Sequence, residues 1–153
     1  MSNKEWGNIT WSFFHTLAAR IDESKFHKIR NLVIDLIIDT CKHLPCPVCR
    51  EDATNIINKS YIQNIQTKRH LVEFLRQLHN IVNIKLHKKI FTEIETKNRY
   101  INYNLNKVFE EFTKIYSISY HNMKLNQTDF HKKNFIQKVQ ATYIQISIIH
   151  RTS

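Results

Sequence analysis

Apolar side chains recur along this chain at spacings of three and four residues, and no stretch of any length alternates apolar and polar positions. A period near 3.6 residues is typical of an α-helix with one buried face, whereas a half-buried strand has a period of two. The clearest case is an apolar stripe between Thr67 and His87, which consists of Leu71, Phe74, Leu75, Leu78, Val82 and Leu86. The sequence therefore predicts an all-α protein.

Four helices joined by short links are expected in the first hundred residues. The first presents Trp11 and His15, with Phe14 and Ala18, on one face, and Asn8 or Thr10 is its candidate cap. The other three are expected over Ser24–Lys42 with Ser24 as the cap, over Pro47–Asn58, and over Thr67–His87. Helices of this length with short links predict a four-helix bundle.

The rest of the chain is expected to be an addition to this bundle. A short helix is predicted over Glu93–Tyr100, and residues 101–153 are predicted to be a C-terminal helical extension to a domain over residues 1–100. Helical spacing in the extension is shown by Val108, Phe112, Ile115, Ile136, Val139, Tyr143 and Ile146. Polar residues from Ser117 to Gln127 mark a weak boundary. The basic stretch around Lys132–Ile149 is expected to be a solvated helix.

The chain has 153 residues, a formal net charge of +10 and one glycine, Gly7. One glycine excludes the glycine-rich loops that cradle phosphates, so helix-borne side chains would have to hold any nucleotide cofactor. The charge favours acidic partners, but the lysines are scattered, and a solvated basic surface is the simpler explanation. We expect a cytoplasmic protein, because no apolar run reaches the roughly 20 residues of a membrane span and no apolar signal region is seen.

Two of the three cysteines lie in the run Cys-Pro-Val-Cys at 46–49. Proline suits the first helical position, which would place Cys46 at the N-cap and Cys49 in the first turn. The positive end of the helix dipole there favours a thiolate. Such a pair is a redox dithiol or half of a zinc site, and Cys41 and His43 could complete four zinc ligands. The run alone leaves both interpretations open.

A polar pair, His79 and Asn83, interrupts the apolar face of the fourth predicted helix. Buried polar side chains cost stability unless they meet a partner. For an isolated pair, satisfaction by backbone groups is the simpler interpretation. The first helix carries an aromatic and histidine pair, Trp11 and His15. A site shared between the two helices is therefore the competing interpretation.

Three motifs in this order resemble the Erv/ALR family of FAD-linked sulfhydryl oxidases. They are Trp6-Gly7 with Trp11 and His15, the Cys-Pro-Val-Cys run, and His79-Asn80-x-Val82-Asn83-x-x-Leu86-x-Lys88. The resemblance covers about Trp6 to Tyr100, and residues 44–54 look like the small members of large DNA viruses, of poxvirus or asfarvirus type. The family usually has glycine where His87 stands. On an unbroken helix Lys88 would point away from His79, so we expect the helix to end near His87.

The resemblance implies a site in which FAD lies inside the helical bundle beside a redox-active disulfide formed by Cys46 and Cys49. The residues implied for FAD binding are Gly7, Trp11, His15, His79, Val82, Asn83, Lys85, Lys88, Arg99 and Tyr100. Trp11 and His15 would pack against the cofactor, and the later positions would contact its adenosine and phosphate portion. No metal site is implied.

The activity implied by the resemblance is FAD-dependent thiol oxidation that forms disulfide bonds in partner proteins. Cys46 would react with a reduced dithiol partner, a thioredoxin-like or small Cys-x-x-Cys protein, and Cys49 would pass electrons to FAD and then to O2, giving H2O2. Many family members carry a second Cys-x-x-Cys pair that shuttles electrons. Here the third cysteine is Cys41, which is predicted to be a buried apolar residue, so no second pair is present. A homodimer through the bundle helices is expected. If the source is a virus, the expected location is the host cytoplasm and also the virion.

The rival interpretation is a zinc-stabilised basic module that binds nucleic acid or protein. The net charge and the Cys/His cluster at residues 41–49 support it. It leaves the pairs Trp11/His15 and His79/Asn83 without a purpose, so nucleic acid is the less favoured partner.

Overall fold

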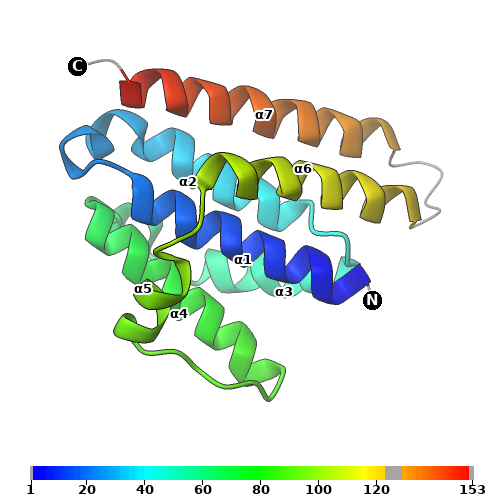
Figure 1. Ribbon diagram of the computed structural model, residues 1–153. Coiled ribbons are helices and arrows are strands. Elements are labelled where there is room, and N and C mark those ends of the chain that lie inside the picture. Colours follow the sequence, from blue (N-terminus) through cyan, green and yellow to red (C-terminus); the bar gives the residue numbers. More distant parts are fainter. Residues whose placement is uncertain (1, 123–128, 152–153) are drawn as a thin grey trace.

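The computed structural model describes residues 2–122 and 129–151, and every regular element in these ranges is helical, which confirms the all-α prediction (Figure 1). The helices are α1 (Ser2–Arg20), α2 (Phe26–Lys42), α3 (Pro47–Asn58), α4 (Lys68–Lys85), α5 (Glu93–Tyr100), α6 (Leu105–Asn122) and α7 (Asp129–Arg151). Two 3-10 turns, Glu23–Lys25 and Ile62–Asn64, precede α2 and α4.

Helix α1 lies between two groups of helices. Figure 1 shows α6 and α7 on one side of α1, and α4 and α5 on the other. Helix α2 contacts α3 and α7. Among the described helices, none combines the length and the apolar character that a membrane crossing requires.

The C-terminal helices share the core of the first hundred residues. Phe13 of α1 contacts Phe109 and Phe112 of α6, with ring centroids 5.1 and 4.8 Å apart, and Tyr143 of α7 stacks on Phe109 at 3.9 Å. The expectation of a solvated last helix is therefore wrong: its apolar stripe is covered by α2 and α6. These contacts cover faces of α1 and α2.

The polar stretch at Ser117–Gln127 was expected to mark a boundary. Its first part, to Asn122, continues α6 without interruption. Residues 123–128 lie outside the described ranges.

Two predicted helix starts are wrong. Helix α1 begins at Ser2, so Asn8 and Thr10 lie inside it, and the Thr10 hydroxyl donates back to the Trp6 carbonyl at 2.6 Å. Ser24 does not cap α2, because Asp22 first caps the 3-10 turn by accepting the Ser24 amide at 3.0 Å. Short polar side chains bond to nearby backbone in both settings, so their presence alone does not fix a helix start.

The C-terminus of α4 is closed by two backbone hydrogen bonds. The Lys88 amide donates to the Asn83 carbonyl at 2.8 Å, and the His87 amide donates to Ile84 at 3.1 Å. This Schellman pattern needs a left-handed residue, and His87 has φ 57°. The helix thus ends near His87, as expected. Leu86, predicted to be apolar core, is instead 56% exposed, since it caps the helix outside the bundle.

Glycine at position 87 is expected to stabilise the fold. A left-handed conformation costs a non-glycine residue about 1 kcal/mol, and glycine adopts it freely. His87→Gly should therefore raise the free energy of unfolding in urea by about 1 kcal/mol. Leu86→Gly is the matched control, because Leu86 is exposed with an ordinary φ of −90°. That control should lower stability by about 0.5–1 kcal/mol, and equal effects of the two glycines would contradict the assignment.

Truncation of a buried extension residue tests whether α6 belongs to the core. Phe112 is fully buried, so Phe112→Ala should lower the free energy of unfolding by about 3–5 kcal/mol. Ile118→Ala, on the same helix but 50% exposed, should change it by less than about 0.5 kcal/mol. Urea unfolding followed by circular dichroism measures both. A small loss for the Phe112 variant would show that α6 is dispensable.

Candidate active site

A disulfide joins Cys46 and Cys49 at the N-terminus of α3, with a Cα–Cα distance of 5.2 Å. Cys46 is the N-cap, as predicted, and its Sγ accepts the Cys49 amide at 3.2 Å. Both cysteines are half-buried against the core, so their exposure does not distinguish them. Between them Val48 is 67% exposed, so the disulfide lies near the protein surface.

An aromatic and histidine cluster joins α1, α4 and α5. The rings of Trp11 and His79 are stacked, with centroids 4.0 Å apart and planes 10° apart. His15 Nε2 lies within hydrogen-bond distance of His79 Nδ1, at 3.0 Å, and the His15 ring also stacks on the ring of Tyr100 at 4.7 Å. Four predicted site residues from three helices are thus in direct contact.

The rings of this cluster are uncharged at neutral pH. Burial, and then the charges of His79 and Arg99, lowers the pKa of His15 to about 3. Burial, and then Arg99 and Lys88, lowers the pKa of His79 to about 4. Burial raises the pKa of Tyr100 to about 12. Since both imidazoles are neutral, one can donate and the other accept in their hydrogen bond.

Two cations lie near the cluster. The Arg99 guanidinium lies over the rings of Phe91 and Tyr100, 5.2 and 5.6 Å from their centroids. Lys88 is exposed beyond the end of α4, and its charge acts on His79. Lys85 forms an exposed ion pair, with its Nζ 3.6 Å from the carboxylate of Asp52 on the disulfide-bearing helix α3.

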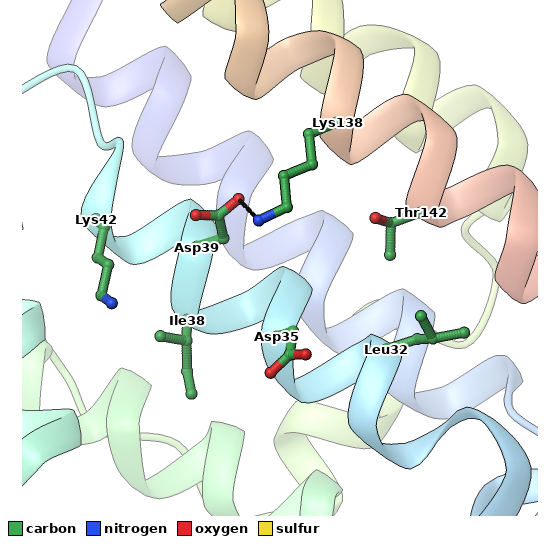
Figure 2. A pocket seen from close by; sticks show the side chains of 7 residues that line it. All are labelled: Leu32, Asp35, Ile38, Asp39, Lys42, Lys138 and Thr142. Atoms are coloured by element: carbon green, nitrogen blue, oxygen red, sulfur yellow. Dashed lines mark ion pairs between the residues drawn. The ribbon is translucent and has the colours of Figure 1, made fainter. Parts of the chain in front are cut away.

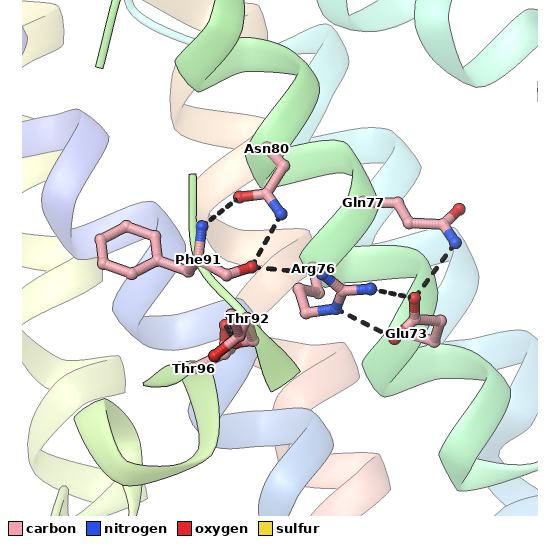
Figure 3. A network of polar contacts seen from close by, with 7 residues as sticks. All are labelled: Glu73, Arg76, Gln77, Asn80, Phe91, Thr92 and Thr96. Atoms are coloured by element: carbon pink, nitrogen blue, oxygen red, sulfur yellow. Dashed lines mark hydrogen bonds and ion pairs between the residues drawn. The ribbon is translucent and has the colours of Figure 1, made fainter. Parts of the chain in front are cut away.

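A polar network holds the segment between α4 and α5 along α4 (Figure 3). Asn80 bonds the backbone of Phe91 twice, donating to its carbonyl and accepting its amide, both at 2.9 Å. Arg76 donates to the same carbonyl at 3.2 Å and pairs with Glu73. The network places Phe91 beside His79, with ring centroids 5.9 Å apart, and so positions α5 with Arg99.

The remaining predicted binding residues lie around this cluster. Asn83 is buried, and its amide donates to the Lys89 carbonyl at 3.1 Å, which makes its role in the structure that of a helix-end anchor. Val82 is half-buried on α4. Gly7 lies on α1 one turn before Trp11, and a Cβ added there would meet no atom within 4 Å, so there is open space beside the helix.

These residues fit a planar, phosphate-bearing cofactor. Uncharged stacked rings accept a flat heterocycle, and the cations Lys88 and Arg99 complement phosphate. The open space at Gly7 lets a ring approach the helix backbone. All of these groups are side chains or a helical glycine, as the single glycine of the chain requires.

The predicted zinc ligands do not assemble. Within the ranges that the structure describes, no group of three or more His, Cys, Asp or Glu side chains could hold a metal ion. Cys41 is a buried free cysteine, as predicted, and burial raises its pKa to about 12. The ring of His43 stacks on Phe135 at 4.6 Å instead of approaching the sulfurs.

Sequence reasoning missed three residues that shape the site: Phe91, Arg76 and Asn80. Asn80 stood inside the motif that carries the resemblance, yet only its neighbours were assigned a role. Its role could have been predicted, because an amide side chain that lies in the middle of a helix and is not exposed needs a hydrogen-bond partner. The partner itself, the Phe91 backbone, is eleven residues away and has no sequence signal.

Comparison with known proteins places most of this chain in a family. A model described as Erv1 / Alr family matches residues 8–101. A protein of Invertebrate iridescent virus 3, named "Putative FAD-linked sulfhydryl oxidase 096R", is 30% identical over 86 residues, 56% of this chain and 58% of the relative. FAD-linked sulfhydryl oxidase ERV1 of Arabidopsis thaliana is 28% identical over 91 residues, 60% of this chain and 47% of the relative.

A viral relative is covered more fully. The FAD-linked sulfhydryl oxidase of African swine fever virus (isolate Pig/Kenya/KEN-50/1950) is 28% identical over 95 residues, 62% of this chain and 79% of the relative. This chain spans about half the length of the iridovirus and plant relatives. No solved structure matches it significantly.

The two buried histidines should make stability depend on pH. In the unfolded chain both histidines bind a proton below about pH 6.5. In the folded protein the pKa of His79 is lowered to about 4 and that of His15 to about 3, so they stay neutral to lower pH. The free energy of unfolding is therefore highest above about pH 6.5 and decreases as the pH falls below that value. From pH 7 to pH 5 the free energy of unfolding should drop by about 2 kcal/mol per histidine. Urea midpoints across this range measure the effect.

A matched pair of variants assigns this pH dependence. His79→Gln should remove about half of the slope, since one of two titrating groups is lost. His27→Gln, at an exposed position of α2, should leave the slope unchanged. Equal slopes in all three proteins would show that the cluster does not control acid stability.

Proposed function

This chain belongs to the Erv1/Alr family, and we propose on that basis that it is an FAD-linked sulfhydryl oxidase that forms disulfide bonds in partner proteins. The observation that carries the proposal is the pairing of two features in the family-matched segment. A surface-proximal disulfide caps α3, and an uncharged aromatic cluster flanked by cations lies between α1, α4 and α5. The names of the relatives support the same activity.

The cluster is the proposed FAD site. Trp11, His15, His79 and Tyr100 offer the ring faces against which the cofactor packs. Lys88 and Arg99 would neutralise its phosphates, while Gly7, Val82 and Asn83 shape the walls and the helix end. Lys85 lies at the surface beside Asp52, so its proposed role is to add positive charge at the end of α4. Neutral histidines suit this role, because a protonated pair would repel and separate.

Thiol exchange is proposed to start at Cys46. A thiolate of the partner attacks the Cys46 sulfur, the Cys46–Cys49 bond breaks, and Cys49 leaves as a thiolate. The second partner thiolate then attacks the partner sulfur of the mixed disulfide, which releases oxidised partner and leaves both cysteines reduced. The amide of Cys49 and the N-terminus of α3 stabilise the negative charge that the Cys46 sulfur carries once the oxidised partner has left.

FAD, when bound, accepts the two electrons of the dithiol and delivers them to O2, which becomes H2O2. Cys49 is proposed as the sulfur that faces the cofactor, since it lies one turn inside α3. The protein would present that sulfur to the bound cofactor and would keep the two histidines of the cluster uncharged.

Partners and location complete the proposal. The substrate is a reduced dithiol protein, thioredoxin-like or with its own Cys-x-x-Cys pair, because no second cysteine pair exists in this chain. A homodimer is proposed, and it must use surfaces other than the faces of α1 and α2 that α6 and α7 cover. The viral relatives support a viral source, and for such a source the proposed location is the host cytoplasm and the virion.

Flavin content and oxygen uptake test the function. The purified protein should be yellow with flavin absorbance, and it should consume O2 in the presence of a reduced dithiol. Cys49→Ser should abolish this uptake while the flavin stays bound, because the electron path is cut at one sulfur. The control Cys41→Ala, at the buried cysteine, should retain uptake within about twofold below its unfolding temperature.

A colourless preparation that contains zinc would contradict the proposal and favour the basic binding module. Retained oxygen uptake in the Cys49 variant would leave the activity standing and refute the role given to that sulfur.

A further inference from the structure

The C-terminal helices contact His43, the residue that caps the end of α2 and begins the short link to Cys46. Tyr120 of α6 donates its hydroxyl hydrogen bond to the His43 carbonyl. Burial raises the pKa of Tyr120, so the hydroxyl keeps the proton that this bond requires. Residues 102–153 lie outside the family-matched segment, and the contact therefore belongs to the part that this chain adds.

Two further contacts converge on the same point. The ring of His43 lies on Phe135 of α7, with centroids 4.6 Å apart and planes 6° apart. Its Nδ1 donates to the Asp39 carbonyl at 2.7 Å, and the carboxylate of Asp39 lies 3.3 Å from Lys138 of α7 (Figure 2). The carbonyl, the ring face and the ring nitrogen of His43 all have defined partners.

Only Leu44 and Pro45 separate this anchored residue from Cys46. Both are buried, and the Cys46 amide donates back to the Leu44 carbonyl at 2.7 Å, so the link is short and tightly turned. Proline also fixes one backbone angle. A displacement at His43 would therefore pass directly to Cys46 and to its capping bond with the Cys49 amide.

We infer that Tyr120 is a positioning residue for the redox disulfide: through the His43 carbonyl it holds Cys46 in the N-cap geometry. That geometry matters more in the reduced protein, because a thiolate accepts an amide hydrogen bond more strongly than a disulfide sulfur does. By stabilising the reduced form, the contact raises the reduction potential of the pair. The inference rests on the proposed function for its meaning, but the potential is a property of the disulfide itself.

The chain offers a matched control for Tyr120 one turn earlier on α6. Tyr116 is also buried and its hydroxyl also makes one hydrogen bond, to Thr10 of α1 at 2.5 Å. Tyr116→Phe and Tyr120→Phe thus each remove one buried hydroxyl and keep the ring. Only the second touches the loop that leads to Cys46.

The experiment measures the Cys46–Cys49 reduction potential in the full purified protein, by anaerobic equilibration with glutathione buffers and alkylation of free thiols. Tyr120→Phe should shift the exchange equilibrium toward the disulfide by about fivefold, which corresponds to about 20 mV lower potential at roughly 30 mV per tenfold change. Tyr116→Phe should shift it less than twofold. Phe135→Leu, which removes the ring stack, should shift it in the same direction as Tyr120→Phe.

A wild-type potential in both Tyr120→Phe and Phe135→Leu would overturn the inference, and so would equal shifts in the two tyrosine variants. Because thiol exchange needs neither flavin nor O2, these outcomes are separate from the test of oxidase activity. A protein without oxygen uptake can still show the shift, and an active oxidase can lack it.

Discussion

Helix α1 is packed on two sides, and both the core and the site depend on this double burial. One face places Phe13 among the rings of α6, and the opposite face places Trp11 and His15 against α4 and α5. A helix covered on both sides has little freedom to rotate or slide, since interiors are close-packed. Trp11 and His15 are therefore held rigidly where His79 can stack and bond.

The proposed cofactor site is built without a glycine loop. In place of backbone amides it uses stacked rings, two neutral histidines and cations from the end of α4 and from α5. Buried imidazoles are costly when charged, so burial itself keeps them neutral and able to share one hydrogen bond. The same burial makes acid the condition under which this arrangement is weakest.

Particular residues show how far the sequence could be interpreted. Cys46 as N-cap followed from proline at the next position, a local rule that the structure confirms. The stripe at Leu71, Leu75 and Leu78 was also local and is buried as predicted. The prediction that Leu86 is buried was wrong, because the helix ends at Lys85 and the chain turns through a left-handed His87. Few non-glycine residues adopt that conformation. The polar positions of the last helix predict a solvated surface, whereas the helices that cover its apolar stripe, α2 and α6, cannot be identified from the sequence.

The sequence by itself determined the helical class and the position of Cys46 at the mouth of a helix, because these follow from period and capping along a few residues. The disulfide and the ring and cation side chains of the site were implied by the family resemblance. Only the tertiary structure decided that His15 faces His79, that Asn80 holds Phe91, and that Tyr120 reaches the His43 carbonyl. These pairs are 64, 11 and 77 residues apart. Such contacts arise from how helices pack, and packing depends on every neighbour at once.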